Sequence, residues 1–214
     1  HAQTKEAIAA GYKYVFYSIA GAFLGLIGFF YIYQLTPSIA FTPGGNFTHA
    51  AIAGHEMTLQ LAVLGMIIGF GSKAGMFPLH GWLSTAHPVA PAPASAILSG
   101  VNTKMGVIAI LRVVYYIAGA DFLWKSFVQY IVIGLTLLTV FMGSMLAFKE
   151  KIMKRRLAYS TVSQVSYILF GIMLLQPAGF VGAMLHVIYH SVIKNNLFLC
   201  AGAVIHETGT TRVE

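Results

Sequence analysis

Residues 55–86 have the sequence HEMTLQLAVLGMIIGFGSKAGMFPLHGWLSTA. This run is apolar along nearly its whole length, yet about 32 residues of straight helix would span roughly 48 Å, well beyond a hydrocarbon core of about 30 Å. Gly71 and Gly75 loosen the backbone, and Pro78 removes a backbone donor shortly after Lys73. The pattern therefore predicts a membrane helix that is broken near Lys73, and broken helices commonly mark ion or substrate sites in transporters.

The composition of the whole chain is that of a protein embedded in a bilayer. Of its 214 residues, 57% are hydrophobic and 9% are charged, whereas ordinary soluble domains carry roughly a quarter charged residues. Apolar runs of about 20 residues, the length that crosses a bilayer as a helix, recur along the sequence. The alternating segments of roughly ten residues that an outer-membrane barrel requires are not found. A water-soluble fold is excluded, and an all-α membrane protein is predicted.

We expect about six transmembrane helices, separated by polar residues or by glycine and proline. Their approximate ranges are 12–35, 55–86, 94–118, 122–148, 157–175 and 179–205. The prolines of residues 87–93, HPVAPAP, predict an extended, polyproline-like connector. We find no internal repeat, and residues 1–214 are predicted to form a single transmembrane domain.

Basic residues give the expected orientation of these helices. The loop between the fourth and fifth segments holds a cluster of five, Lys149, Lys151, Lys154, Arg155 and Arg156. Cytoplasmic loops carry the excess of Lys and Arg, so this loop is predicted to be cytoplasmic, with Lys5, Lys13 and Arg212 on the same side. Residues 36–54 hold no Lys or Arg and are predicted to face outward. The formal charge of +7 is therefore a topology signal, and no nucleic-acid partner is expected.

Lys73, Lys104 and Lys194 lie too deep within apolar segments to reach the membrane surface by extending their side chains. A charged lysine at a helix centre costs about 2.5 kcal/mol or more, so each should face protein or water. A structural lysine bonded to backbone carbonyls is one interpretation. The other is a proton-loading site, because a mobile neighbouring charge can decide whether a buried amine keeps its proton.

The sixth segment carries His186, His190 and Lys194 at a spacing of four residues. This spacing places them on one helix face in steps of about 6 Å, which one or two waters can bridge. Either histidine could instead be a neutral side chain bonded to another helix. Haem ligation would need a further histidine at matching depth, since two histidines four apart on one helix cannot ligate opposite faces of a haem.

The fifth segment places four polar residues on one face, and they are predicted to line the same polar interior: Ser160, Ser163, Gln164 and Tyr167. This signal is weak alone, because serine and threonine are common in helix packing within membranes. No carboxylate lies at mid-membrane, so a sodium site in this stretch is poorly supported and an acidic partner outside the chain is expected. The single cysteine, Cys200, can make neither an internal disulfide nor a cysteine-ligated cluster. We therefore predict no metal or cofactor site in this chain.

Several linked motifs carry a resemblance to a known family. They are GSKAGMFPLHGWL at 71–83, AHPVAPAPASAILSG at 86–100, KRRLAYSTVSQ at 154–164, and the helix with His186, His190 and Lys194. In this order they resemble the antiporter-like, proton-translocating subunits shared by respiratory complex I, Mrp-type cation/proton antiporters and membrane-bound hydrogenases. The resemblance covers essentially the whole chain.

This resemblance implies a bundle of about fourteen helices in two inverted halves, each with a broken helix, of which the chain would be helices six to eleven. It implies that Lys73 is the lysine of the broken helix, that Lys104 relays protons toward the centre, and that the histidines and lysine of the sixth segment form a central polar axis. The glutamate partner of Lys73 would precede His1, and the terminal residue of the second half would follow Glu214. Two departures from the family pattern, at 84–85 and 152–153, lie near the predicted cytoplasmic surface.

The resemblance also implies a function: proton translocation as a subunit of a complex I or hydrogenase type of oxidoreductase, with no redox centre in this chain. An Mrp-type sodium/proton antiporter subunit is an alternative, and a non-conducting membrane scaffold is an alternative of another class. The expected partners are the lipid bilayer, other membrane subunits including neighbouring antiporter-like ones, and, for an oxidoreductase, a peripheral flavin/iron–sulfur module. The expected location is a bacterial or archaeal cell (inner) membrane.

Overall fold

The computed structural model describes residues 4–48 and 52–213. The helices, in chain order, are α1 (Lys5–Leu35), α3 (Glu56–Ala74), α4 (Gly81–Val89), α5 (Ala92–Ile97), η1 (Leu98–Asn102), α6 (Thr103–Arg112), η2 (Val113–Ala118), α7 (Ala120–Leu123), α8 (Phe127–Lys149), α9 (Met153–Met173) and α10 (Pro177–Thr208), where η denotes π-helical turns. His1 and Glu214, the predicted limits of the domain, lie outside the described residues.

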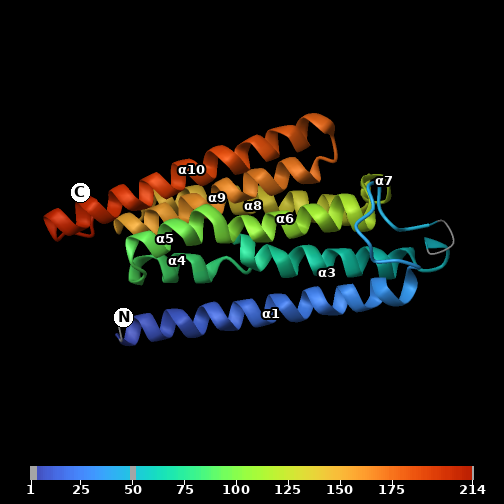
Figure 1. The fold of residues 1–214 in the computed structure, drawn as a ribbon, viewed down its shortest axis with the longest axis horizontal. Helices are drawn as coiled ribbons and strands as arrows, with labels where there is room; N and C mark the ends of the chain where they lie inside the picture. Colours follow the sequence, from blue (N-terminus) through green and yellow to red (C-terminus); the bar gives the residue numbers. More distant parts are fainter. Residues whose placement is uncertain (1–3, 49–51, 214) are drawn as a thin grey trace.

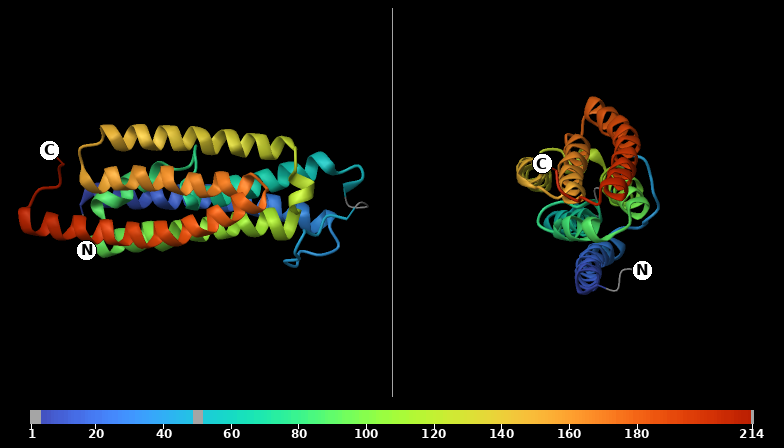
Figure 2. Two further views of the ribbon diagram at one scale, coloured as in Figure 1. Left: turned by 90° about the horizontal axis from the view of Figure 1, so that it is seen from above. Right: turned by 90° about the vertical axis from the view of Figure 1, so that its left-hand side faces the viewer.

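The long helices lie side by side in a bundle (Figures 1 and 2). α1 packs on α3 and α4, α3 packs on α6, and α9 lies against α4, α8 and α10. Both ends of the described chain and the turn from α8 to α9 lie at one end of the bundle, and the loop after α1 lies at the other (Figures 1 and 2). The predicted basic residues of the termini and of the 149–156 loop therefore share one end.

Among the described residues, five helical stretches are long and apolar enough to cross a membrane: α1, α3, residues 92–118, α8 and α10. The remaining predicted segment is α9, which is more polar but forms a helix of 21 residues. Its Thr161, Ser163 and Ser166 are buried. Because α9 packs against α4, α6, α8 and α10, these hydroxyls meet protein and not lipid. The all-α membrane fold is confirmed, with a helix at each of the six predicted segments.

The break predicted near Lys73 is confirmed. α3 ends at Ala74, and Gly75 takes a left-handed conformation with φ 85°, which glycine adopts without a Cβ clash. The N–H groups of Gly75 and Met76 both donate to the carbonyl of Gly71 at 2.9 Å, which closes the end of the helix. The chain then turns through residues 76–80 before it enters α4.

Trp82 joins α4 to the C-terminal end of α3 through a hydrogen bond. Its indole Nε1–H donates to the carbonyl oxygen of Ser72 at 2.7 Å, and this carbonyl belongs to the last turn of α3, where partners within the helix run out. Trp82 is buried, and the ring of Tyr14 on α1 packs against it edge to face with centroids 5.1 Å apart. The two halves of the broken helix and α1 therefore meet at one aromatic cluster.

The extended connector predicted for residues 87–93 is wrong. α4 continues to Val89, α5 begins at Ala92, and only residues 90–91 lie outside helix. Pro88 removes a single hydrogen bond near the end of α4, and Pro93 lies in the first turn of α5, where a missing N–H breaks no intrahelical bond. Prolines at these positions are compatible with two short helices joined by a tight turn.

Backbone hydrogen bonds join the loop after α1 to η2. Its backbone N–H groups at Thr42, Gly44 and Asn46 donate to the carbonyls of Tyr116, Tyr115 and Ile117, at 3.1, 3.2 and 2.8 Å. A π-helical turn that ends at residue 118 leaves these carbonyls without partners in its own helix. The loop therefore satisfies them and covers that end of the bundle.

Candidate functional site

Lys73 lies in the last turn of α3 and is half-buried. Its Nζ donates to the hydroxyl of Tyr14 at 2.7 Å and to the hydroxyl of Ser18 at 3.0 Å, both on α1. It also lies 4.4 Å from the ring centroid of Tyr14. The C-terminal end of a helix and the face of an aromatic ring both favour a positive charge. The ion pairs found among the described residues, Arg155–Glu150 and His206–Glu207, lie elsewhere, so Lys73 is held there by hydroxyls and not by a carboxylate.

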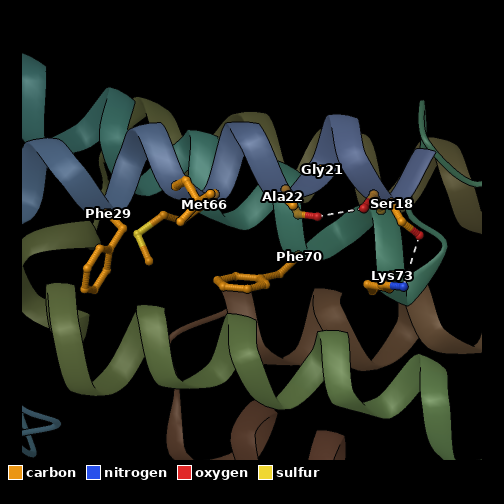
Figure 3. A pocket seen from close by; sticks show the side chains of 11 residues that line it. Ser18, Gly21, Ala22, Phe29, Met66, Phe70 and Lys73 are labelled. Atoms are coloured by element: carbon orange, nitrogen blue, oxygen red, sulfur yellow. Dashed lines mark hydrogen bonds between the residues drawn. The ribbon is translucent and has the colours of Figure 1, made fainter. Parts of the chain in front are cut away.

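A groove of about 520 Å³ runs between α1 and α3 and ends at Lys73. Figure 3 shows Phe29 and Met66 toward one end and Ser18 and Lys73 toward the other, with the hydrogen bond between the last two drawn. Apart from that polar end, the walls are mostly aliphatic and aromatic side chains. Lys73 is thus the charged group at the end of an otherwise apolar groove.

Lys104 on α6 and His190 on α10 form a buried pair. Each is 4% exposed, and Lys104 Nζ lies 2.8 Å from His190 Nδ1. Lys104 Nζ also donates to the carbonyl oxygen of Ser99, in η1, at 2.6 Å. A charged lysine has only donors, so His190 then offers a lone pair on Nδ1 and carries its proton on Nε2. The π-helical turn η1 lies directly ahead of Lys104, and such turns inside helices are frequent at functional sites.

Lys194 lies one turn beyond His190 and is 3% exposed. Its Nζ donates to the carbonyl of Leu157 at 3.2 Å and to the hydroxyl of Ser160, both on α9. His186, one turn before His190, is half-buried, and the two imidazole rings stack with centroids 5.9 Å apart at 11°. The structure therefore brings His186, His190 and Lys194 to one face of α10, as their spacing predicts.

The four predicted lining residues of α9 do not share one environment. Ser160 contacts Lys194, and the Tyr167 ring lies 6.5 Å from the His186 ring but is 48% exposed. Ser163 instead faces α8, where its hydroxyl bonds with that of Ser144 at 2.9 Å. Gln164 is half-buried. Because α9 is packed on two sides, residues three apart on its polar face turn toward different neighbours.

Sequence reasoning missed three residues at the site: Tyr14, Ser18 and His87. The first two are four apart on α1 and so share a face, but other tyrosines of α1 gave the same signal. His87 on α4 is fully buried, and its ring stacks on Phe198 of α10 at 4.5 Å. Neither of its ring nitrogens has a hydrogen-bond partner among the described residues. The burial of His87 was not predicted, because residues 87–93 were expected to form an extended connector.

The described residues contain no cluster of three or more His, Cys, Asp or Glu placed to hold a metal ion. The stacked rings of His186 and His190 follow one helix face, so they do not form a pair of opposite axial ligands. The ionisable groups of the site are the amines of its lysines and the imidazoles of its histidines, which can bind and release protons.

A family described as NADH:quinone oxidoreductase/Mrp antiporter, transmembrane, matches residues 1–213. The chain belongs to this family. It is 33% identical over 98% of its length to an NADH-quinone oxidoreductase subunit of Desulforudis audaxviator. It is 34% identical over 99% of its length to a hydrogenase-4 component of Escherichia coli, and 32% identical over 97% to a Na⁺/H⁺ antiporter subunit of Alkalihalophilus pseudofirmus. The chain spans 41%, 32% and 41% of these three relatives.

Solved structures of membrane complexes contain chains with the same fold. A chain of the Mrp complex from a Dietzia species matches with a TM-score of 0.86 and 27% identity, over 98% of this chain and 38% of that one. A chain of the membrane-bound sulfane sulfur reductase, an archaeal respiratory membrane complex, matches with a TM-score of 0.84 and 27% identity, over 99% and 42%. The family and the membrane-embedded fold expected from the motifs are confirmed.

Proposed function

We propose that the complete protein is an antiporter-like subunit that moves protons across an energy-converting membrane through buried lysines, histidines and water. The contact of 2.8 Å between Lys104 and His190 carries this proposal. It joins two basic side chains that are both almost fully buried, on helices far apart in sequence. Burying two bases without an acid is costly for stability, and this cost is expected at a site where a proton must move.

The chemistry of this pair is a proton transfer between nitrogens. An N–H bond of the Lys104 ammonium breaks as a new N–H bond forms at His190 Nδ1, which leaves a neutral amine and an imidazolium. The imidazolium can then release the proton on Nε2 at the opposite side of the ring. A histidine thus carries a proton across its own width without rotating.

In the proposed path, Lys73 exchanges protons at the broken helix, where Gly71, Gly75 and Pro78 free the backbone. Lys104 passes protons to the central axis of His190, His186 and Lys194, with Ser160 and Tyr167 as part of its wall. Ser160 supports this role through its hydrogen bond with Lys194. Waters are proposed to bridge the gaps, as polar groups spaced one helical turn apart allow.

The proposed setting is a multisubunit oxidoreductase of the complex I or membrane-bound hydrogenase type in a bacterial or archaeal cell membrane. Neighbouring antiporter-like subunits and a peripheral flavin/iron–sulfur module are the proposed partners, with no cofactor in this chain. The likeness to the Na⁺/H⁺ antiporter relative and to the Mrp complex supports an Mrp-type cation/proton antiporter as a second candidate. Co-purifying flavin and iron–sulfur proteins would identify the first, and small membrane subunits alone would identify the second.

Lys73→Met tests proton translocation against a non-conducting scaffold. Methionine keeps the length of the side chain and its helix preference but cannot titrate, so the variant should assemble and lose coupled proton uptake. Lys73→Arg should also be severely impaired, because arginine hardly releases its proton. The measurement is proton uptake into proteoliposomes that contain the whole complex, normalised to the amount assembled. Near-normal uptake by the methionine variant would make Lys73 a structural residue.

A further inference from the structure

Tyr14 is the point at which three elements of the bundle, α1, α3 and α4, meet. Its ring, on α1, packs against Trp82 of α4, and its hydroxyl accepts a hydrogen bond from Lys73 of α3 at 2.7 Å. Ser18, one turn further along α1, accepts a second hydrogen bond from Lys73 at 3.0 Å.

A lysine that gains and loses a proton needs a partner suited to both forms. The ammonium form has three donors and no acceptor, whereas the neutral amine presents a lone pair that requires a donor. A carboxylate partner would accept in both states, and a carbonyl has no donor. A hydroxyl can accept from the ammonium and donate to the amine without changing its position.

We infer that Tyr14 is the positioning residue that lets Lys73 change its protonation state, by reversing the hydrogen bond between them. With Lys73 charged, Nζ donates to the Tyr14 oxygen, as in the described structure. With Lys73 neutral, the Tyr14 O–H donates to Nζ. The lysine nitrogen therefore keeps this partner in both states, which avoids the cost of an unsatisfied group. The inference rests on the proposed function, because it assigns Tyr14 to the proton exchange of Lys73.

The test replaces Tyr14 with 3,5-difluorotyrosine in the full-length subunit within its assembled complex. Fluorine makes the hydroxyl a stronger donor and a weaker acceptor, and both changes favour neutral Lys73. The pH profile of proton uptake into proteoliposomes should therefore move toward lower pH. Tyr17 is the matched control, because it lies on the same helix and packs against the same Trp82 cluster, whereas the hydrogen bonds of Lys73 to α1 in the described structure go to Tyr14 and Ser18.

Tyr14→Phe is the second variant, because phenylalanine keeps the ring contact with Trp82 and removes only the hydroxyl. Proton uptake should fall about tenfold, the factor expected for the loss of a hydrogen bond to a charged group, while Tyr17→Phe stays near the parent rate. If Tyr14→Phe fails to assemble, the fluorotyrosine profile alone decides. An unchanged profile with fluorotyrosine at position 14, while Lys73→Met is inactive, would overturn the role of Tyr14 and leave the proposed function standing. Normal uptake by Lys73→Met would overturn the proposed function itself.

Discussion

The three interior lysines have different sets of partners. Lys73 donates to two hydroxyls of α1, Lys104 lies between a carbonyl and an imidazole, and Lys194 donates to a carbonyl and a serine hydroxyl. Lys104 stands out because its partner His190 is itself a base that can take up the proton. At the level of single residues, variants of this pair can distinguish proton transfer from a structural hydrogen bond.

His190→Asn is expected to keep much of the structure and to lose the proton transfer. The asparagine side chain places a polar atom close to the position of Nδ1, so Lys104 keeps a hydrogen-bond partner, but an amide cannot carry the proton. Proton uptake of the assembled complex in proteoliposomes should fall at least about tenfold, in the range typical of lost acid–base groups. Lys5→Met, at the exposed start of α1, is the control for loss of a positive charge.

Lys104→Met should lower proton uptake to a similar extent. The variant with both substitutions should be no worse than either single variant, because the two residues act in one proton transfer. Additive losses in the double variant would show that Lys104 and His190 work in separate steps. Near-normal uptake by His190→Asn would show that their contact is structural.

At the level of elements, the position of α3 depends on close contact between helix backbones. A Cβ at Gly69 would lie 2.8 Å from the backbone nitrogen of Gly25 on α1, and a Cβ at Gly106 would lie 2.7 Å from the carbonyl oxygen of Phe70. Backbone atoms cannot move aside as a flexible side chain can. Small residues thus hold α3 between α1 and α6, and this contact sets the distance from Lys73 to the hydroxyls of Tyr14 and Ser18.

Gly69→Ala should destabilise the assembled complex by about 1–3 kcal/mol, the usual range for overpacking a tight contact. Gly65→Ala, one turn away on the same helix, is the matched control, because its Cβ would meet only the Leu24 carbonyl at 3.5 Å, an ordinary contact. That control should be neutral or slightly stabilising, since alanine favours helix over glycine. Thermal denaturation of the purified complex measures both, and equal melting temperatures for the two variants would show that α1 and α3 are not in close contact at Gly69.

At the level of the whole molecule, the basic end of the bundle gathers the 149–156 loop and both ends of the described chain (Figure 1). The C-terminal tail is joined to this loop by backbone bonds, with Met153 N–H donating to Thr211 O at 2.9 Å and Val213 N–H to Lys151 O at 2.8 Å. The opposite end is covered by the loop after α1. The two ends therefore differ in charge, and this difference predicts which one faces the cytoplasm.

Labelling of single cysteines tests this orientation. The parent is Cys200→Ala, because Cys200 is free and exposed. Lys151→Cys, at the basic end, should be protected from an impermeant thiol reagent in intact cells, and Ser38→Cys, in the loop after α1, should react. Both should react after the cells are opened. Labelling of Lys151→Cys from outside intact cells would reverse the assigned orientation.

Patterns along the chain were enough to predict the membrane environment, the helices and the positions of the ionisable groups. Hydropathy and segment length required membrane helices, because an unpaired backbone is too costly in hydrocarbon. The excess length of residues 55–86, with its glycines and proline, located the break beside Lys73, and the four-residue spacing on α10 placed two histidines and a lysine on one face. These features are local, so periodicity and backbone chemistry are enough to read them.

The contacts between side chains on different helices depend on the tertiary fold. Lys73 contacts Tyr14, which is 59 residues away in the sequence, and Lys104 contacts His190, which is 86 residues away. Ser163 faces α8 although it shares the polar face of α9. His87 is a buried residue of α4, although an extended connector was predicted there. Packing against neighbouring helices sets the depth and rotation of each helix, so hydrogen bonds between helices cannot be predicted from the pattern along one of them.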